Sequence, residues 1–206
     1  MPDLRILLED SALLVVDKPA GLLVHPAGSV QSGTLRDLAE AYLGFRPGLP
    51  HRLDRETSGV MVLCKTPAAL SRFGNHFQRR LIKKRYLALV HGEVASDRCI
   101  EFPIGHNPAK TPTWDVDPEG RPARTELSAL HSGTFSLVSL VPVTGRTHQL
   151  RIHCAAIGHP MVGDDWYGSK VVGPLCLHAE EIRFFHPVSN VETVVRAPRP
   201  AWAQAF

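Results

Sequence analysis

Apolar and polar residues alternate in short blocks along the whole chain. Short runs rich in leucine and valine, bounded by charged or turn-forming residues, predict strands. These runs lie at 5–8, 13–16, 22–24, 60–64, 86–90, 126–130, 135–141, 175–177, 182–185 and 191–196. Longer segments with apolar residues at helical spacing lie at 34–44, at 66–80 and after Gly145. Many short strands and few helices predict an α+β fold, with a large mixed, mostly antiparallel sheet and helices packed on its faces.

Residues that favour helix ends mark the limits of these helices. Thr34 is the predicted N-cap of the first helix, and Gly44 is predicted to end it. Thr66 and Pro67 fit the N-cap and the first helical position of the second helix. Thr147 is the predicted N-cap of the third helix.

A dense polar cluster lies between two of these blocks, in the segment 51–59 with the sequence HRLDRETSG. The apolar run at 60–64 follows at once, so the cluster is predicted to be a loop whose end is fixed to the core. Binding and catalytic groups tend to lie on loops that a rigid scaffold holds in this way. Taken alone, the segment is more typical of a charged surface turn.

Length and charge limit the choice of function. A chain of 206 residues fits a single domain, 1–206, and can bury a substantial core. The net charge is only +3, but most of the basic residues are arginine, whose planar group suits phosphate and base stacking. Five cations lie close together, at Arg79, Arg80, Lys83, Lys84 and Arg85. They form either a solvated face or a track for an RNA backbone.

Several classes of protein do not fit. The first ten residues lack the apolar region of a signal peptide, and the uncharged stretch 127–145 is too often interrupted by polar residues to cross a membrane. The four cysteines are far apart and form no C-x-x-C pair, which argues against a zinc site. We expect a cytoplasmic monomer with free thiols, no cofactor and no metal.

Three further stretches give the segment 51–59 a context. They are KPAG at 18–21, KRYLALVHG at 84–92 and TGRTHQLRIH at 144–153. In this order the four motifs resemble those of the RluA family of pseudouridine synthases. That family carries K-P-x-G, H-R-L-D-x-x-[TS]-S-G, K-x-Y-x-A-x-V-x-G and G-R-x-H-Q-[LI]-R-x-H. No room precedes Lys18 for an S4-type RNA-binding domain, so the chain resembles the short, catalytic-domain-only branch.

The resemblance implies an isomerase that converts uridines of structured RNA, in tRNA or large-subunit rRNA, to pseudouridine without a cofactor or metal. It implies that Asp54 is the catalytic carboxylate and that Tyr86 supports the flipped-out base. The residues expected to bind the substrate are Arg52, Lys84, Arg146 and His148. His51 is given no catalytic role and is expected only to brace the loop.

The chemistry needs a charged carboxylate, and an aspartate, whose ordinary pKa is about 3.9, is already ionised at neutral pH. It also needs a cation that keeps this carboxylate charged in a dry pocket. Arg151 lies among core positions of the third helix and needs a carboxylate partner of its own. Asp54 is the predicted partner, since arginine can bind a carboxylate through two hydrogen bonds. The residues leave open whether Asp54 adds to C1′ of the ribose or to C6 of the uracil.

Two other classes remain possible from the residues. A glycoside hydrolase could use Asp54 with Glu56, but such enzymes need carboxyl groups about 5–9.5 Å apart across a sugar. A non-catalytic RNA-binding module would explain the basic residues. It would not explain a pairing of Asp54 with Arg151.

Overall fold

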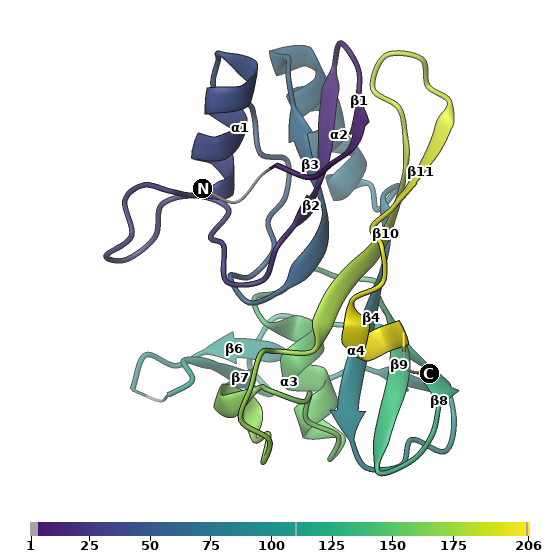
Figure 1. Ribbon diagram of the computed structural model, residues 1–206. Coiled ribbons are helices and arrows are strands. Elements are labelled where there is room, and N and C mark those ends of the chain that lie inside the picture. The colour runs from purple at the N-terminus through teal and green to yellow at the C-terminus, as the bar shows by residue number, and fades with distance from the viewer. Residues whose placement is uncertain (1–3, 110, 205) are drawn as a thin grey trace. The chain divides into compact units, whose positions relative to one another are not determined.

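The computed structural model describes residues 4–109, 111–204 and 206, and the chain forms two compact units (Figure 1). The first unit comprises residues up to 84 together with 179–198, and the second comprises 85–178 and 199–206. Within the described residues, all the strand pairs given below are antiparallel. With helices beside these strands, the predicted α+β fold class is confirmed.

The first unit is built on a row of neighbouring strands. In sheet order they are β1 (Ile6–Glu9), β2 (Leu13–Lys18), β3 (Ser58–Cys64) and β10 (Leu177–Phe185), with β11 (Glu192–Arg196) paired to β10. Strands β2 and β3 pair from Leu13 opposite Cys64 to Lys18 opposite Gly59. This register sets the Lys18 motif beside the end of the segment 51–59.

Helix α1 (Leu35–Leu43) is confirmed with both of its predicted ends. Thr34 accepts a hydrogen bond from the backbone N–H of Asp37, and the Asp37 carboxylate accepts from the Thr34 N–H in return, which completes a capping box. Gly44 ends the helix in the left-handed conformation, with φ of 76°, where a glycine avoids steric strain.

Helix α2 (Pro67–Gln78) begins as predicted, with Thr66 accepting from a backbone N–H of the first turn. Its apolar stripe faces the main core of this unit, where the rings of Phe73 and Phe184 lie 4.9 Å apart. Val62 of β3 belongs to the same cluster. Strand β3, into which the segment 51–59 continues, is therefore fixed by packing against α2.

The second unit combines a four-stranded antiparallel sheet, a short ribbon and short helices. In order, its sheet strands are β4 (Lys83–His91), β9 (Phe135–Pro142), β8 (Thr125–His131) and β5 (Arg98–Ile100). The ribbon pairs β6 (Ile104–His106) with β7 (Trp114–Val116). The helical elements are α3 (Gln149–Ala156), the single-turn η1 (Asp165–Tyr167) and α4 (Ala201–Gln204). Helix α3 packs against β7, as Figure 1 shows.

Three local predictions were wrong. The segment 22–24 forms no strand, because the carbonyls of Leu23 and Val24 accept hydrogen bonds from the first N–H groups of α1. The strands expected at 175–177 and 182–185 belong to one strand, β10, which begins at Leu177. The N-cap of α3 is His148, in the left-handed conformation with φ of 53°, and not Thr147.

A side chain explains the late start of α3. The amide oxygen of Gln149 accepts from the Thr144 hydroxyl and from the Arg146 N–H, so it organises the turn before the helix. The turn before the helix is therefore held by a residue that lies inside the helix.

Across the described residues, no helix combines the length and the apolar character needed to span a bilayer.

Candidate active site

The segment 51–59 is held in the first unit by buried residues that stand among exposed and half-buried ones. Leu53 and Thr57 are buried, and the Thr57 N–H donates to the Asp54 carbonyl at 3.2 Å, which closes a tight turn. Asp54 itself is half-buried, and Arg52 is exposed. The turn therefore combines fixed anchors with polar side chains that a substrate can reach.

Lys18 joins the first motif to this turn. Its side chain is fully buried, and its three N–H bonds go to three carbonyls, those of Pro19 and Leu22 at 2.8 Å and of Arg55 at 3.0 Å. The Arg55 carbonyl also accepts from the Gly21 N–H at 2.9 Å. An ammonium group with all its donors used in this way ties the turn at 19–22 to the backbone directly after Asp54.

The charge of Lys18 also matters for Asp54. Burial lowers the pKa of Lys18 to about 8, while the carboxylates of Glu56 and Asp54 act in the opposite direction and favour the charged form. The ammonium is therefore mostly protonated at neutral pH. It places a buried cation near the two carboxylates.

His51 braces the turn as a neutral side chain. Its Nε2 accepts a hydrogen bond from the Val62 N–H of β3 at 3.1 Å, and its ring lies 5.4 Å from that of Phe77. Burial lowers the pKa of His51 to about 3, and the nearby charge of Lys84 acts in the same direction. A neutral imidazole that accepts from the backbone positions the loop, which agrees with the bracing role expected from the sequence.

The pKa of His51 predicts a loss of stability in acid. In the unfolded chain this histidine takes up a proton near pH 6.5, whereas in the folded chain it stays neutral down to about pH 3. The unfolded state therefore binds more protons as the pH falls through this window, and folding stability decreases. Because of this histidine, the free energy of unfolding is expected to be about 2 kcal/mol lower at pH 5.0 than at pH 7.5.

Urea unfolding at the two pH values, on the parent and on His51→Gln, measures this cost. Glutamine can still accept from the Val62 N–H but does not titrate, so the variant is expected to lose about 2 kcal/mol less between pH 7.5 and 5.0. Equal losses in both proteins would show that His51 is protonated in the folded state.

Strand β4 carries two of the predicted site residues. Tyr86 lies opposite Leu140 in the pairing with β9 and is 7% exposed. Lys84 is half-buried, with its Nζ 5.6 Å from the centre of the Phe77 ring, and burial lowers the pKa of its ammonium. Lys83 is exposed. The substrate-binding role of Lys84 stays a prediction.

Arg151 is held by a carboxylate that the sequence interpretation did not single out. Its Nε and Nη2 each donate to the Asp164 carboxylate at 2.7 Å, and both side chains are buried. The expectation that a buried Arg151 needs a carboxylate is confirmed, and Asp164 supplies it. A guanidinium has five N–H donors, so Arg151 can hold Asp164 and serve a second carboxylate as well. The predicted pairing with Asp54 stays a prediction.

Two aromatic residues next to Asp164 surround the same guanidinium. The centres of the Tyr167 and Trp166 rings lie 5.0 Å and 5.4 Å from the central carbon of Arg151. The Tyr167 hydroxyl donates to the Trp114 carbonyl at 2.9 Å, so at its 3.0 Å contact with His148 it accepts from the Nδ1–H. His148 is therefore oriented by a fixed hydroxyl.

A buried polar network supports the base of α3. Gln149 donates to the Thr125 hydroxyl at 3.0 Å, and Thr125 in turn donates to Nδ1 of His153 at 2.9 Å. The Nε2 of His153 donates to the Phe102 carbonyl at 3.0 Å. Burial lowers the pKa of His153, which keeps this ring neutral. Gln149 and His153, both in the motif at 144–153, therefore help to fix the helix that carries Arg151.

The structure brings some predicted residues together within each unit. Asp54 lies near Lys18 in the first unit, and Arg151 shares its aromatic neighbours with His148 in the second. Arg146 is half-buried, and its Nε donates to the Pro122 carbonyl. Glu56 is exposed and 3.4 Å from the Nε of Arg55, as expected for a solvated residue.

Asp164, Trp166 and Tyr167 were missed because they lie outside every periodic segment. The available signal was local: two acidic residues and two aromatic residues stand between two glycines in the sequence GDDWYG. Such a turn is unusual in its content, but only the three-dimensional structure shows that it closes around Arg151.

Comparisons with known proteins agree with the motifs. A family model described as RNA pseudouridylate synthase matches residues 12–156, a range that contains all four motifs. The ribosomal large subunit pseudouridine synthase D of Nitrosomonas europaea is 37% identical, and the match covers 96% of this chain and 62% of that protein. An uncharacterised RNA pseudouridine synthase of Bacillus subtilis is 35% identical, with 97% and 70% covered.

A solved structure shows the same fold. The human RNA pseudouridylate synthase domain containing 1 superposes with a TM-score of 0.83 and 30% identity, covering 96% of this chain and 84% of that one. Against the bacterial relative from Nitrosomonas europaea, the chain spans 62% of the length.

Proposed function

The chain belongs to the RluA family of RNA pseudouridylate synthases, and from this premise we propose that it isomerises specific uridines of structured RNA to pseudouridine. The observation that carries the proposal is the Asp54 turn, which sets a half-buried carboxylate near the buried ammonium of Lys18. The reaction breaks the N1–C1′ bond, turns the uracil and joins C5 to C1′; C5 then loses its hydrogen as a proton and N1 takes up a proton, so the mass is unchanged.

In this proposal Asp54 adds to an electrophilic carbon of the flipped-out uridine, either C1′ or C6. Lys18 and the turn hold the carboxylate in place, and a carboxylate needs no general base to act as a nucleophile. Arg151 is the second cation of the mechanism and is itself fixed by Asp164. The target base must leave the RNA stack to reach these groups.

The remaining predicted residues bind the RNA. Arg52 is exposed on the turn and suits the phosphates next to the flipped nucleotide. Lys84, Arg146 and His148 complete the predicted substrate contacts. Large-subunit rRNA is the first RNA to test, because the relative from Nitrosomonas europaea is named for it, and tRNA is the second. A single domain, 1–206, that acts in the cytoplasm as a monomer remains part of the proposal.

Nucleoside analysis tests this function against its two alternatives. The protein is incubated with unmodified transcripts of large-subunit rRNA and tRNA, which are then digested and separated by chromatography. A pseudouridine synthase converts uridine into an isomer of the same mass. A glycoside hydrolase would release free uracil, and an RNA-binding module would leave every uridine unchanged. Either of these two results would refute the proposal.

Tyr86 is the proposed platform for the flipped base. Tyr86→Phe keeps the ring and should keep most of the turnover, whereas Tyr86→Leu fills the core without a π-face and should lose it. Base–aromatic stacking is worth about 1–3 kcal/mol, which corresponds to roughly a 5-fold to 150-fold effect. Single-turnover pseudouridine formation measures the rate, and thermal melting checks that both variants fold. If Tyr86→Leu matches the parent, Tyr86 serves only the core.

A further inference from the structure

We propose that Trp166 is an RNA-contacting residue that stacks on a base flanking the target uridine. It would contribute to substrate affinity and not to the chemical step. This inference rests on the proposed function, because the RNA is the substrate of that reaction. All the contacts that support it are made within the second unit.

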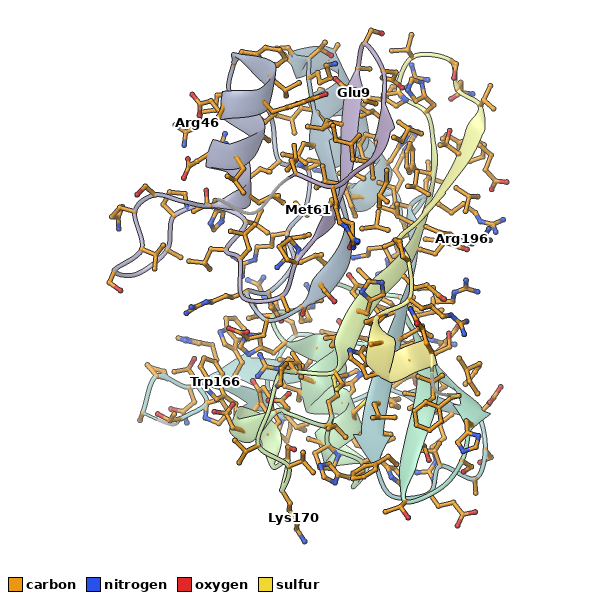
Figure 2. All side chains as sticks on the ribbon, viewed as in Figure 1. Glu9, Arg46, Met61, Trp166, Lys170 and Arg196 are labelled. Carbon is orange, nitrogen blue, oxygen red and sulfur yellow. The ribbon has the colours of Figure 1, made fainter. Side chains whose placement is uncertain are left out.

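Trp166 is exposed to an extent that packing does not explain. Its side chain, labelled in Figure 2, lies on η1 and is 53% exposed. Within the described part of the chain no other phenylalanine, tyrosine or tryptophan is more exposed. Tryptophan has the largest apolar surface of all side chains and is commonly found where one face meets a partner. Packing in the protein core therefore does not account for this exposed indole.

The ring is held in place although it faces solvent. It lies 5.4 Å from the central carbon of Arg151 and makes an edge contact with the His148 ring at 5.5 Å. Arg151 is fixed by its two hydrogen bonds to Asp164, and His148 by the Tyr167 hydroxyl. A ring that is already ordered loses little conformational entropy when a base stacks on it.

The neighbours of Trp166 favour RNA as the partner. Arg151 and His148, whose side chains lie against the indole, belong to the motif that the proposed function assigns to the substrate. Proteins that bind single-stranded nucleic acid commonly stack successive bases on aromatic side chains. Exposed Asp165 is the preceding residue in the chain and repels phosphate, so the contact depends on stacking and not on charge. Because every base has a π-face, the contribution should be tolerant of sequence.

Binding and kinetics of four variants test the proposal with an unmodified large-subunit rRNA transcript. Trp166→Ala is expected to raise the Kd by roughly 5-fold to 150-fold, the range of base–aromatic stacking. Trp166→Phe should lose less, and Trp166→Leu should lose nearly as much as alanine. In steady-state assays the loss should fall mainly on KM. The matched control is Tyr42→Ala, because Tyr42 is 52% exposed but donates its hydroxyl to Glu9 in the other unit.

The outcomes separate stacking from other roles. A Kd for Trp166→Ala equal to that of Tyr42→Ala would overturn the proposal. A loss in kcat with unchanged affinity would also overturn it, since Trp166 would then only cover Arg151. Full affinity in Trp166→Leu would exclude stacking. If the parent makes no pseudouridine yet Trp166→Ala binds RNA weakly, the proposed function fails while the RNA contact stands.

Discussion

Replacing Asp164 by asparagine is expected to lower the free energy of unfolding by about 3–5 kcal/mol, because the variant leaves Arg151 buried without its charged partner. Both hydrogen bonds of the pair are 2.7 Å long, and Asp164 is 1% exposed, so solvent cannot replace the lost carboxylate. Turnover should fall as well, since the guanidinium loses the contact that fixes its orientation.

Thermal melting and single-turnover kinetics measure the two effects. The expected decrease in Tm is on the order of 10 °C for a chain of this size. Asp165→Asn is the matched control, because it makes the same chemical change at the neighbouring, exposed position and should leave both quantities near the parent's. Should Asp164→Asn melt and turn over like this control, the pair would have no structural or functional importance.

Replacing Asp54 by asparagine is expected to abolish pseudouridine formation while the protein stays folded and binds RNA. The amide has nearly the same shape as the carboxylate but carries no charge and is a poor nucleophile. Folding should survive, because Lys18 is held by three carbonyls and Arg151 by Asp164, and neither depends on Asp54 alone. RNA affinity should be kept or increase, since one negative charge leaves the site.

Circular dichroism and RNA filter binding check the fold and the affinity of this variant. Glu56→Gln is its matched control, an exposed carboxylate two residues along the same turn. The control should form pseudouridine at close to the parent's rate. A strong loss of turnover in Glu56→Gln would instead favour a mechanism with two carboxylates, as in a glycoside hydrolase.

Local signals in the sequence predicted much of the fold. The caps Thr34, Gly44 and Thr66 act through contacts with their own helices, so residue type and spacing were sufficient to place α1 and the start of α2. Strands β2 and β3 are buried apolar runs with clear boundaries, and they were found for the same reason. The ribbon of β6 and β7 has only three residues in each strand, too few to show a period.

The supports of the candidate site could not be predicted, because they join residues that are distant in sequence. Lys18 reaches the carbonyl of Arg55, and Arg151 finds Asp164 in a turn without periodic pattern. The start of α3 was misplaced by one residue: His148 takes the N-cap position, and Gln149, inside the helix, organises the preceding turn. Motifs identified the chemical groups, whereas tertiary contacts decide how each group is held.

Release of tritium from uracil C5 tests the central claim, that Asp54 carries out pseudouridine formation, most directly. The parent and Asp54→Asn are incubated under single-turnover conditions with a large-subunit rRNA transcript labelled at C5 of uracil, and with labelled tRNA in parallel. The account predicts release by the parent from at least one of these RNAs and none above background by the variant, although the variant binds the same RNA. Release by Asp54→Asn at a rate near the parent's would contradict it.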